Sequence, residues 1–315
     1  MTFQNIKTTL LATSILSAFA MQPAAAQTQY GYENVDGHEI FFREAGDPND
    51  PALVLLHGFP SSSHQYRELI DDLSDEFYLI APDYLGFGAS DFPSAEVYDY
   101  TFDNIADTMD SFLEQRGVDE YSLYIQDYGA PVGMRIATEH PERVQALIVQ
   151  NGNVYEEGLS PDAFAPIRAF WEGGRNAEFE AQLAAQVFSF EGLKWQYTHG
   201  TRNPEAILPD NWLLDYQLIN REGQHDMQIG LFFDYQNNVA LYPEWQAYLK
   251  EQQPPALIVW AANDFYFPTP GAEGFQRDLN DVDYNILDTG HFALEEDGEL
   301  IAEKIRGFFE ARDIN

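Results

Sequence analysis

The 315-residue sequence contains no cysteine. This absence excludes disulfide bonds, thiol nucleophiles, zinc–thiolate sites and lipid attachment through a cysteine side chain. Basic residues are also scarce, with 16 lysines and arginines against 52 acidic residues and a formal net charge of −36. Such a charge disfavours contact with nucleic acids and anionic membranes, and we predict neither as a partner.

Long apolar runs are missing beyond the N-terminus. The run at residues 10–21 follows a single cation, Lys7, and precedes small residues that end at Ala26. This order is typical of a secretory signal peptide, and the run is too short to predict a membrane span. We therefore predict a signal peptide over residues 1–26 and export to the periplasm or the medium. The alternative is an apolar helix that packs on the core.

Short apolar or β-branched runs alternate with longer amphipathic segments from residue 39 onward, which predicts a wound α/β sheet. Several runs are apolar at every position, as expected of parallel strands that helices cover on both faces. The clearest predicted strands are residues 52–56, 78–81, 122–126, 146–150, 256–260 and 284–287.

One long segment, residues 155–250, is rich in aromatic residues and has helical patterns but no comparable strand. We predict that it forms a helical cap on a core of residues 27–154 and 251–315. Such a cap would lie over the carboxyl ends of the strands, where open α/β sheets bind ligands. The alternative is an independent second domain.

The chain also lacks the G-x-S-x-G motif of a serine nucleophile elbow. Asp127 stands at the corresponding place, directly after a predicted strand, and Gly129 supplies the small residue that an elbow needs two positions later. We predict that Asp127 is a nucleophile. A carboxylate can displace a leaving group from an sp³ carbon and form an alkyl-enzyme ester, which water then hydrolyses.

Two residues complete a triad in the chain order of the α/β-hydrolases, nucleophile, acid and histidine. Asp264 and His291 each follow one of the last two predicted strands. We predict that His291 is the general base that activates water and that Asp264 orients it. Glu156, which follows an earlier strand, is the alternative acid.

Two backbone N–H groups, those of Phe59 and Tyr128, are predicted to form an oxyanion hole. His57 precedes the first of them and is interpreted as a structural hydrogen-bonding residue rather than a second base. The remaining histidines lack metal-ligand spacing, so we predict no metal and no cofactor.

Together, these motifs resemble those of the epoxide hydrolase and haloalkane dehalogenase branch of the α/β-hydrolases. The resemblance covers residues 52–150 and 255–306 and implies a mostly parallel sheet with an inserted helical cap. It also implies a small apolar electrophile and water as reactants. The residues that carry it are His57-Gly58-Phe59-Pro60, the segment 83–90, the Asp127 elbow, Asp264 and His291.

Within that branch, the resemblance implies that cap tyrosines protonate the oxygen of an opening epoxide, with Tyr235 and then Tyr197 as candidates. We predict hydrolysis of an epoxide to a diol, although packing is the alternative role of both tyrosines. Haloalkane dehalogenation stays open. Tyr128 stands where such enzymes usually have a tryptophan, and Phe59 lacks a side-chain donor, but Gln126 resembles the dehalogenase elbow.

Two other hypotheses concern different chemistry. A fluoroacetate-type dehalogenase would need arginines beside the nucleophile, whereas Arg135 is a full helical turn further along the chain. A ligand-binding receptor on a hydrolase scaffold would not need Asp127, Asp264 and His291 together.

Overall fold

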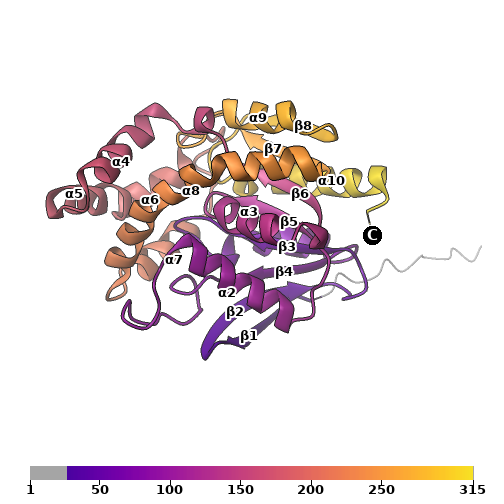
Figure 1. Ribbon diagram of the computed structural model, residues 1–315, viewed down its shortest axis with the longest axis horizontal. Coiled ribbons are helices and arrows are strands. Elements are labelled where there is room, and N and C mark those ends of the chain that lie inside the picture. The colour runs from indigo at the N-terminus through magenta and orange to yellow at the C-terminus, as the bar shows by residue number, and fades with distance from the viewer. Residues whose placement is uncertain (1–26, 315) are drawn as a thin grey trace, which may run out of the picture.

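The computed structural model describes residues 27–314, so the predicted signal peptide lies outside the described residues. One eight-stranded sheet runs through the molecule between layers of helices (Figure 1). The strand order is β1-β2-β4-β3-β5-β6-β7-β8, parallel from β4 to β8 and antiparallel at β1 and β2. The predicted α/β-hydrolase fold class is confirmed. The strands are β1 (Gln29–Val35), β2 (His38–Ala45), β3 (Ala52–Leu56), β4 (Tyr78–Pro82), β5 (Tyr121–Gln126), β6 (Val144–Gln150), β7 (Ala256–Ala261) and β8 (Val282–Leu287).

All six predicted strands are present, and β1 and β2 add an antiparallel hairpin that the apolar runs did not indicate. The residues of β1 are exposed or partly buried except Val35, so this strand has no apolar run. The hairpin turns at Asp36 and Gly37, whose φ values are +51° and +91°. Asp-Gly is a favourable sequence for a turn with two left-handed residues.

Helices cover both faces of the sheet, and the alternation of β3 shows how the strand side chains divide between them. Val54 and Leu56 pack into one apolar core with α2, α3 and α8, whereas Leu53 and Leu55 pack into the other with α1 and α10. The helices are α1 (Arg67–Leu73), α2 (Phe102–Gln115), α3 (Gly129–Glu139), α4 (Pro161–Gly173), α5 (Ala177–Val187), α6 (Phe190–Thr198), α7 (Asp210–Ile219), α8 (Gln224–Gln252), α9 (Pro270–Asp278) and α10 (Leu294–Arg312), with short 3₁₀ turns η1 (Ser63–Tyr66), η2 (Pro141–Arg143) and η3 (Glu156–Gly158).

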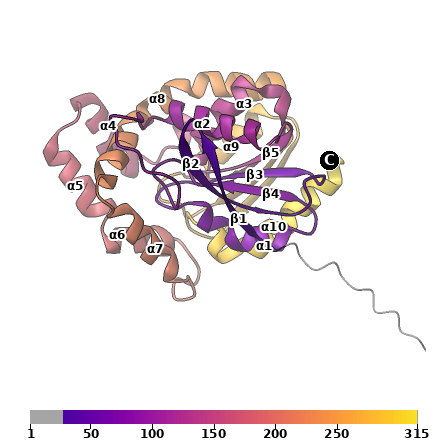
Figure 2. The ribbon, with the colours of Figure 1, turned by 90° about the horizontal axis from the view of Figure 1, so that it is seen from below.

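Between β6 and β7, the described chain forms η3 and helices α4 to α8 and contains no strand. Helices α4 to α7 stand beyond one end of the sheet, and α8 runs back from them along the side of α2 and α3 (Figures 1 and 2). Local sequence starts three of these helices, because Ser160, Asn176 and Ser189 each accept a hydrogen bond from a first-turn N–H.

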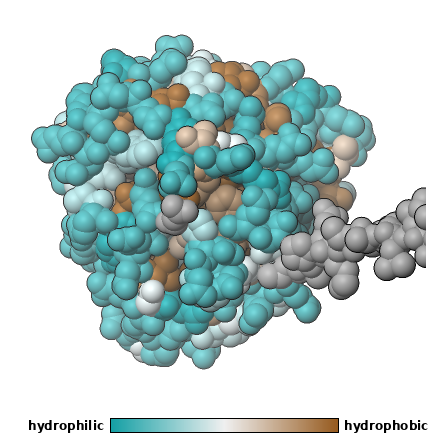
Figure 3. All heavy atoms as spheres, turned by 90° about the vertical axis from the view of Figure 1, so that its right-hand side faces the viewer, coloured by the Kyte–Doolittle hydropathy of each residue, from teal (hydrophilic) through white to brown (hydrophobic). Residues whose placement is uncertain are grey.

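The face remote from α4 to α7 carries mostly hydrophilic side chains with small apolar groups between them (Figure 3). Among the described residues, no helix is long and apolar enough to cross a bilayer.

Candidate active site

Asp127 occupies a tight turn between β5 and α3 with a φ of +50°, the left-handed region that side chains other than glycine rarely adopt. Gly129 allows this turn because a Cβ there would lie 2.0 Å from the carbonyl oxygen of Leu56. A Cβ on Gly133 would likewise lie 2.6 Å from Ile125. The two glycines therefore let α3 approach the sheet closely and present Asp127 at the strand end.

Two backbone N–H groups hold one oxygen of this carboxylate. Phe59 and Tyr128 each donate to Asp127 Oδ1 at 2.7 Å. Gly58 makes room for the approach, since a Cβ there would lie 2.3 Å from the Cβ of Asp127. Burial raises the pKa of Asp127, and His291 together with the two N–H groups opposes that rise. The predicted oxyanion-hole donors thus converge on the predicted nucleophile.

His291 lies between the two acidic residues that the sequence singles out. Its Nδ1 is 2.8 Å from Asp264 Oδ2, and its Nε2 is 3.9 Å from Asp127 Oδ2. The other oxygen of Asp264 accepts the N–H groups of Tyr266 and Phe267 at 2.7 and 3.3 Å. Burial disfavours the imidazolium, but the Asp264 carboxylate, with Asp127, outweighs burial and raises the pKa of His291.

Sequence reasoning gave no role to Gln126, which contacts the same imidazole. Its Nε2 lies 3.0 Å from His291 Nε2, and its Oε1 accepts a 3.4 Å hydrogen bond from Gln65. Gln126 and Gln65 are buried. A polar residue at the end of an otherwise apolar strand, directly before the nucleophile, was the available signal.

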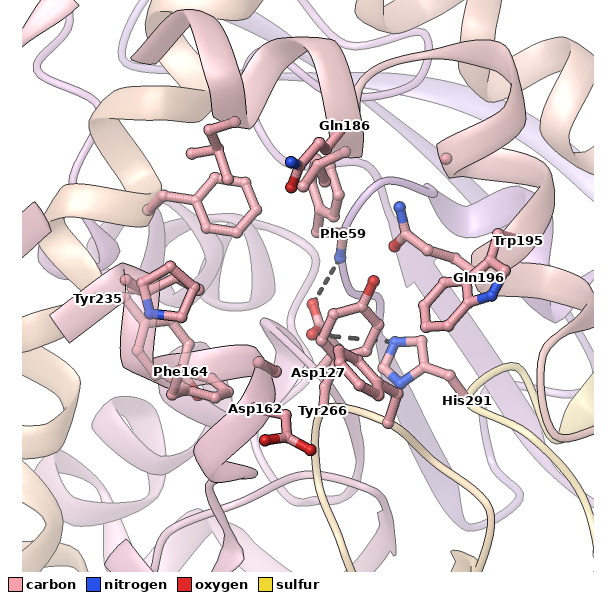
Figure 4. A pocket seen from close by; sticks show the side chains of 18 of the residues that line it. Phe59, Asp127, Asp162, Phe164, Gln186, Trp195, Gln196, Tyr235, Tyr266 and His291 are labelled. Carbon is pink, nitrogen blue, oxygen red and sulfur yellow. Dashed lines mark hydrogen bonds and ion pairs between the residues drawn. The ribbon is translucent and has the colours of Figure 1, made fainter. Parts of the chain in front are cut away.

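A cavity of about 660 Å³ opens above Asp127 and His291, between the strand ends and helices α4, α5, α6 and α8. Figure 4 shows Asp127 on its wall with dashed contacts to Phe59 and His291. Its lining is largely apolar, as expected of a site for a small apolar ligand. The aromatic lining residues are Phe59, Tyr128, Phe164, Phe179, Trp195, Phe232, Tyr235, Phe265, Tyr266 and Phe267.

Tyr235, in α8, is one of the two predicted proton donors and lines this cavity. Its hydroxyl lies 3.5 Å from that of Tyr242, and only 4% of the residue is exposed. Burial raises the pKa of Tyr235 well above its ordinary value, so the hydroxyl keeps its proton at neutral pH. The structure therefore brings Tyr235 to the same cavity as Asp127.

Tyr197, the second candidate donor, is not among the residues that line the cavity. Its hydroxyl donates to Asp215 Oδ2 at 2.5 Å, and its ring stacks on Phe292 with centroids 3.9 Å apart. The structure instead places Tyr266 in the lining, two residues after Asp264. Sequence reasoning missed Tyr266 because the loop after β7 was searched only for an acid.

Two further residues from the sequence analysis, His57 and the alternative acid Glu156, have partners other than Asp127 and His291. His57 is buried, with Nδ1 3.1 Å from the Gly58 carbonyl and Nε2 accepting from the N–H of Tyr84, and burial lowers its pKa to about 3. Glu156 pairs with Arg168 at 2.5 Å on the surface. No group of histidines and carboxylates suited to a metal ion occurs within residues 27–314.

A family model described as alpha/beta hydrolase fold matches residues 51–298. The chain therefore belongs to the α/β-hydrolase fold family, as its motifs predicted. The chain is 40% identical over 275 residues to an uncharacterized hydrolase of Saccharomyces cerevisiae, an alignment that covers 87% of this chain and 94% of the relative. This relationship identifies the chain as an enzyme of the hydrolase family.

Other relatives carry more specific names. A haloalkane dehalogenase of Mycolicibacterium paratuberculosis is 39% identical over 133 residues, which cover 42% of this chain and 44% of the relative. A cis-3-alkyl-4-alkyloxetan-2-one decarboxylase of Shewanella oneidensis is 27% identical over 283 residues, covering 87% and 86%. The dehalogenase relative supports the predicted dehalogenase and epoxide hydrolase branch.

Solved structures agree on the fold. Haloalkane dehalogenase DbeA from Bradyrhizobium elkani matches with a TM-score of 0.75 at 18% identity, over 91% of this chain and 99% of that one. Epoxide hydrolase CorEH matches with a TM-score of 0.72 at 19% identity, over 91% and 100%. Because the two scores are nearly equal, the backbone does not separate these two activities.

Proposed function

We propose that the protein hydrolyses small apolar epoxides to diols through a covalent ester on Asp127. The observation that carries this proposal is that Asp127, His291 and Tyr235 line one apolar cavity, and that burial raises the pKa of Tyr235 so that its hydroxyl keeps its proton. A strained ring ether needs a nucleophile at carbon and a proton at oxygen, and these groups supply both.

In the first step, Asp127 Oδ2 attacks a ring carbon while the N–H groups of Phe59 and Tyr128 hold Oδ1. The carbon–oxygen bond of the ring breaks, and its electron pair stays on the oxygen. That oxygen takes the proton of the Tyr235 hydroxyl. The product is a hydroxyalkyl ester of Asp127, and the Tyr235 phenolate is reprotonated from water before the next turnover.

In the second step, His291 Nε2 takes a proton from water, and the hydroxide attacks the carboxyl carbon of Asp127. Negative charge develops on Oδ1, where the two N–H groups already point. Removing one such donor typically costs about 10²–10³ in rate. The tetrahedral intermediate then expels the diol as an alkoxide, which takes the proton back from His291. Asp127 releases its carboxyl proton to solvent, and this balances the proton that Tyr235 takes up from water.

Two observations favour an oxygen leaving group over a halide. Tyr128 follows the nucleophile in place of an indole N–H donor, and Phe59 offers only its backbone N–H. In addition, the name of one relative describes an oxetan-2-one, a strained ring whose leaving atom can also be oxygen. Both features suit a site that protonates oxygen.

Haloalkane dehalogenation is the second candidate, favoured by the 39% identity to a haloalkane dehalogenase over 133 residues. The first step would be the same attack by Asp127, with the halide leaving the carbon. Trp195 also lines the cavity and carries an indole N–H. This candidate needs halide release without any requirement for Tyr235.

The deciding experiment incubates the protein, from about Gln27, with epoxides and bromoalkanes of matched carbon skeleton and measures diol and bromide. Diol formation that disappears in Asp127→Ala would support the proposal. Bromide release without diol formation would establish the second candidate instead. If the folded protein forms neither diol nor bromide, both activities are excluded.

We also propose that the chain is exported, because residues 1–26 have the order of a secretory signal peptide. Expression of the full chain followed by cell fractionation tests this. The proposal predicts a periplasmic or secreted protein whose mass corresponds to cleavage near Ala26. An uncleaved cytoplasmic protein would contradict it.

A further inference from the structure

We propose that Gln126, itself held by Gln65, is a positioning residue that keeps the reactive nitrogen of His291 a proton acceptor. This inference rests on the proposed function, because it assumes that His291 Nε2 activates water. It adds a second determinant of the histidine's protonation state beside Asp264, on the opposite side of the ring.

The contact with Asp264 determines which nitrogen of a neutral His291 carries the proton. Nδ1 lies 2.8 Å from the carboxylate of Asp264, an acceptor, so the ring's single proton resides on Nδ1. Nε2 then carries the single lone pair, which accepts a hydrogen bond from the Gln126 amide and, in the second step, also from the attacking water. The Gln126 amide nitrogen lies 3.0 Å from that lone pair, in a position that is fully buried.

The orientation of the Gln126 amide is set from its far side. Gln65, in η1, donates from Nε2 to Gln126 Oε1 at 3.4 Å, which leaves the NH₂ group of Gln126 facing His291. Gly58 makes room for this side chain, since a Cβ there would lie 2.6 Å from Gln126 Oε1. One glycine thus accommodates both the nucleophile and the amide beside it.

A donor that faces Nε2 stabilises the neutral imidazole and destabilises the imidazolium, because two N–H groups would then face each other. Gln126 therefore opposes the two carboxylates near the ring, Asp264 and Asp127, which raise the pKa of His291. The phenol of Tyr266, whose ring centre lies 5.3 Å from the imidazole, is the other titratable group against it. In the ester intermediate, Asp127 has no charge, so Asp264 and Gln126 are left to set the protonation of the base.

The direct test is an NMR titration of the His291 imidazole in the free, full-length mature enzyme. Gln126→Leu should raise the pKa of His291 by about one unit, which is tenfold in the protonation equilibrium. Gln126→Glu should raise it further, because a carboxylate accepts from the imidazolium. Gln65→Leu should raise it least, because Gln126 is retained and only its orientation is released.

Gln150 supplies the matched control. It is buried at the end of β6, paired with Gln126 in the sheet register, and donates to the backbone carbonyl of His291 at 3.2 Å rather than to the ring. Gln150→Leu therefore should leave the pKa of the imidazole unchanged. If Gln126→Leu leaves this pKa unchanged or lowers it, the inference is wrong, whatever the result for Gln126→Glu.

A second readout uses the chemistry. In single-turnover experiments, Gln126→Glu should form the Asp127 ester at a near-normal rate but hydrolyse it slowly at neutral pH, with recovery at higher pH. Gln126→Leu, which adds no buried charge, should move the acid limb of ester hydrolysis in the same direction. Since the NMR titration needs no substrate, it separates failure of this inference from failure of the proposed covalent route.

Discussion

Two buried carboxylates, Asp127 at the end of β5 and Asp215 in α7, lie in surroundings that use them differently. Burial raises the pKa of both. Asp127 has compensation from two N–H donors and from His291, and it faces a cavity. Asp215 has one phenolic donor, that of Tyr197, and its pKa rises to about 7. The difference teaches that donors and access, rather than burial alone, suit Asp127 to the nucleophile role that we propose for it.

Several buried polar atoms near Asp215 also lack hydrogen-bond partners in the protein. Within residues 27–314, Asp215 Oδ1, both amide atoms of Asn211 and the hydroxyl of Ser61 are buried without a hydrogen-bond partner in the protein. Such groups normally bind ordered water. We refer to this region, where α7 lies near the loop after β3, as the Asp215 junction.

The sharpest way to break the comparison is to remove each charge with the same substitution. Asp127→Asn should reduce diol formation by at least about 10⁴-fold, because the covalent step is lost, a size comparable to other triad deletions. Asp215→Asn should keep turnover within about threefold, since surface and structural changes outside a site act mainly on stability. Steady-state product assays on both variants decide this. Equal losses in the two would contradict the assignment of Asp127.

A variant of His291 distinguishes the role of the base from that of the nucleophile. His291→Gln should slow ester hydrolysis by about 10³-fold or more while the attack by Asp127 continues, because general-base catalysis alone contributes about 10²–10⁴. Intact-protein mass spectrometry should then show the enzyme plus the whole substrate, with the added mass mapped to Asp127. A variant that turns over no substrate and gains no mass would argue against the covalent route.

The site residues at the carboxyl ends of the strands were predictable from sequence, because each of them directly follows a strand. Parallel strands bring their carboxyl ends to one edge, so Asp127, Asp264 and His291 had to approach one another once the strands were recognised. Gly129 and the N–H donors of Phe59 and Tyr128 were predicted in the same way, from their positions relative to strand ends. These predictions need only local sequence information, namely an apolar run and the residues that follow it.

The positions of side chains on helices α4 to α8 were less predictable, because helix packing decides which face of each helix meets the cavity. Tyr235 and Tyr197 looked alike in the sequence, yet one lines the cavity and the other binds Asp215. Gln126 was visible but had no assigned partner, because its contact with Gln65 crosses from β5 to η1. Tertiary contacts of this kind leave no periodic signal.

The two tyrosines sharpen the comparison between the cavity and the Asp215 junction. Tyr235→Phe should lower diol formation by about 10²-fold, the lower end of the contribution of general-acid catalysis, with ester hydrolysis unchanged. Tyr197→Phe should leave turnover within about threefold and cost about 1–3 kcal/mol of stability, because it removes the hydrogen bond to a buried group. Single-turnover kinetics and denaturant titration measure the two effects. A larger catalytic loss in Tyr197→Phe would return that residue to the site.

The last prediction concerns stability alone and expects no change in turnover. Because the pKa of Asp215 is about 7 in the folded state and 3.8 ordinarily, folding favours its neutral form. Its contribution to stability is complete below pH 4 and declines as pH rises to about 7, by on the order of 4 kcal/mol for a shift of about three units. Asp215→Asn removes this titration, so the variant should gain stability over the wild type from pH 4 to pH 8. Denaturant unfolding across that range measures the gain, and a constant difference between the two proteins would mean that Asp215 is charged in the folded state at every pH tested.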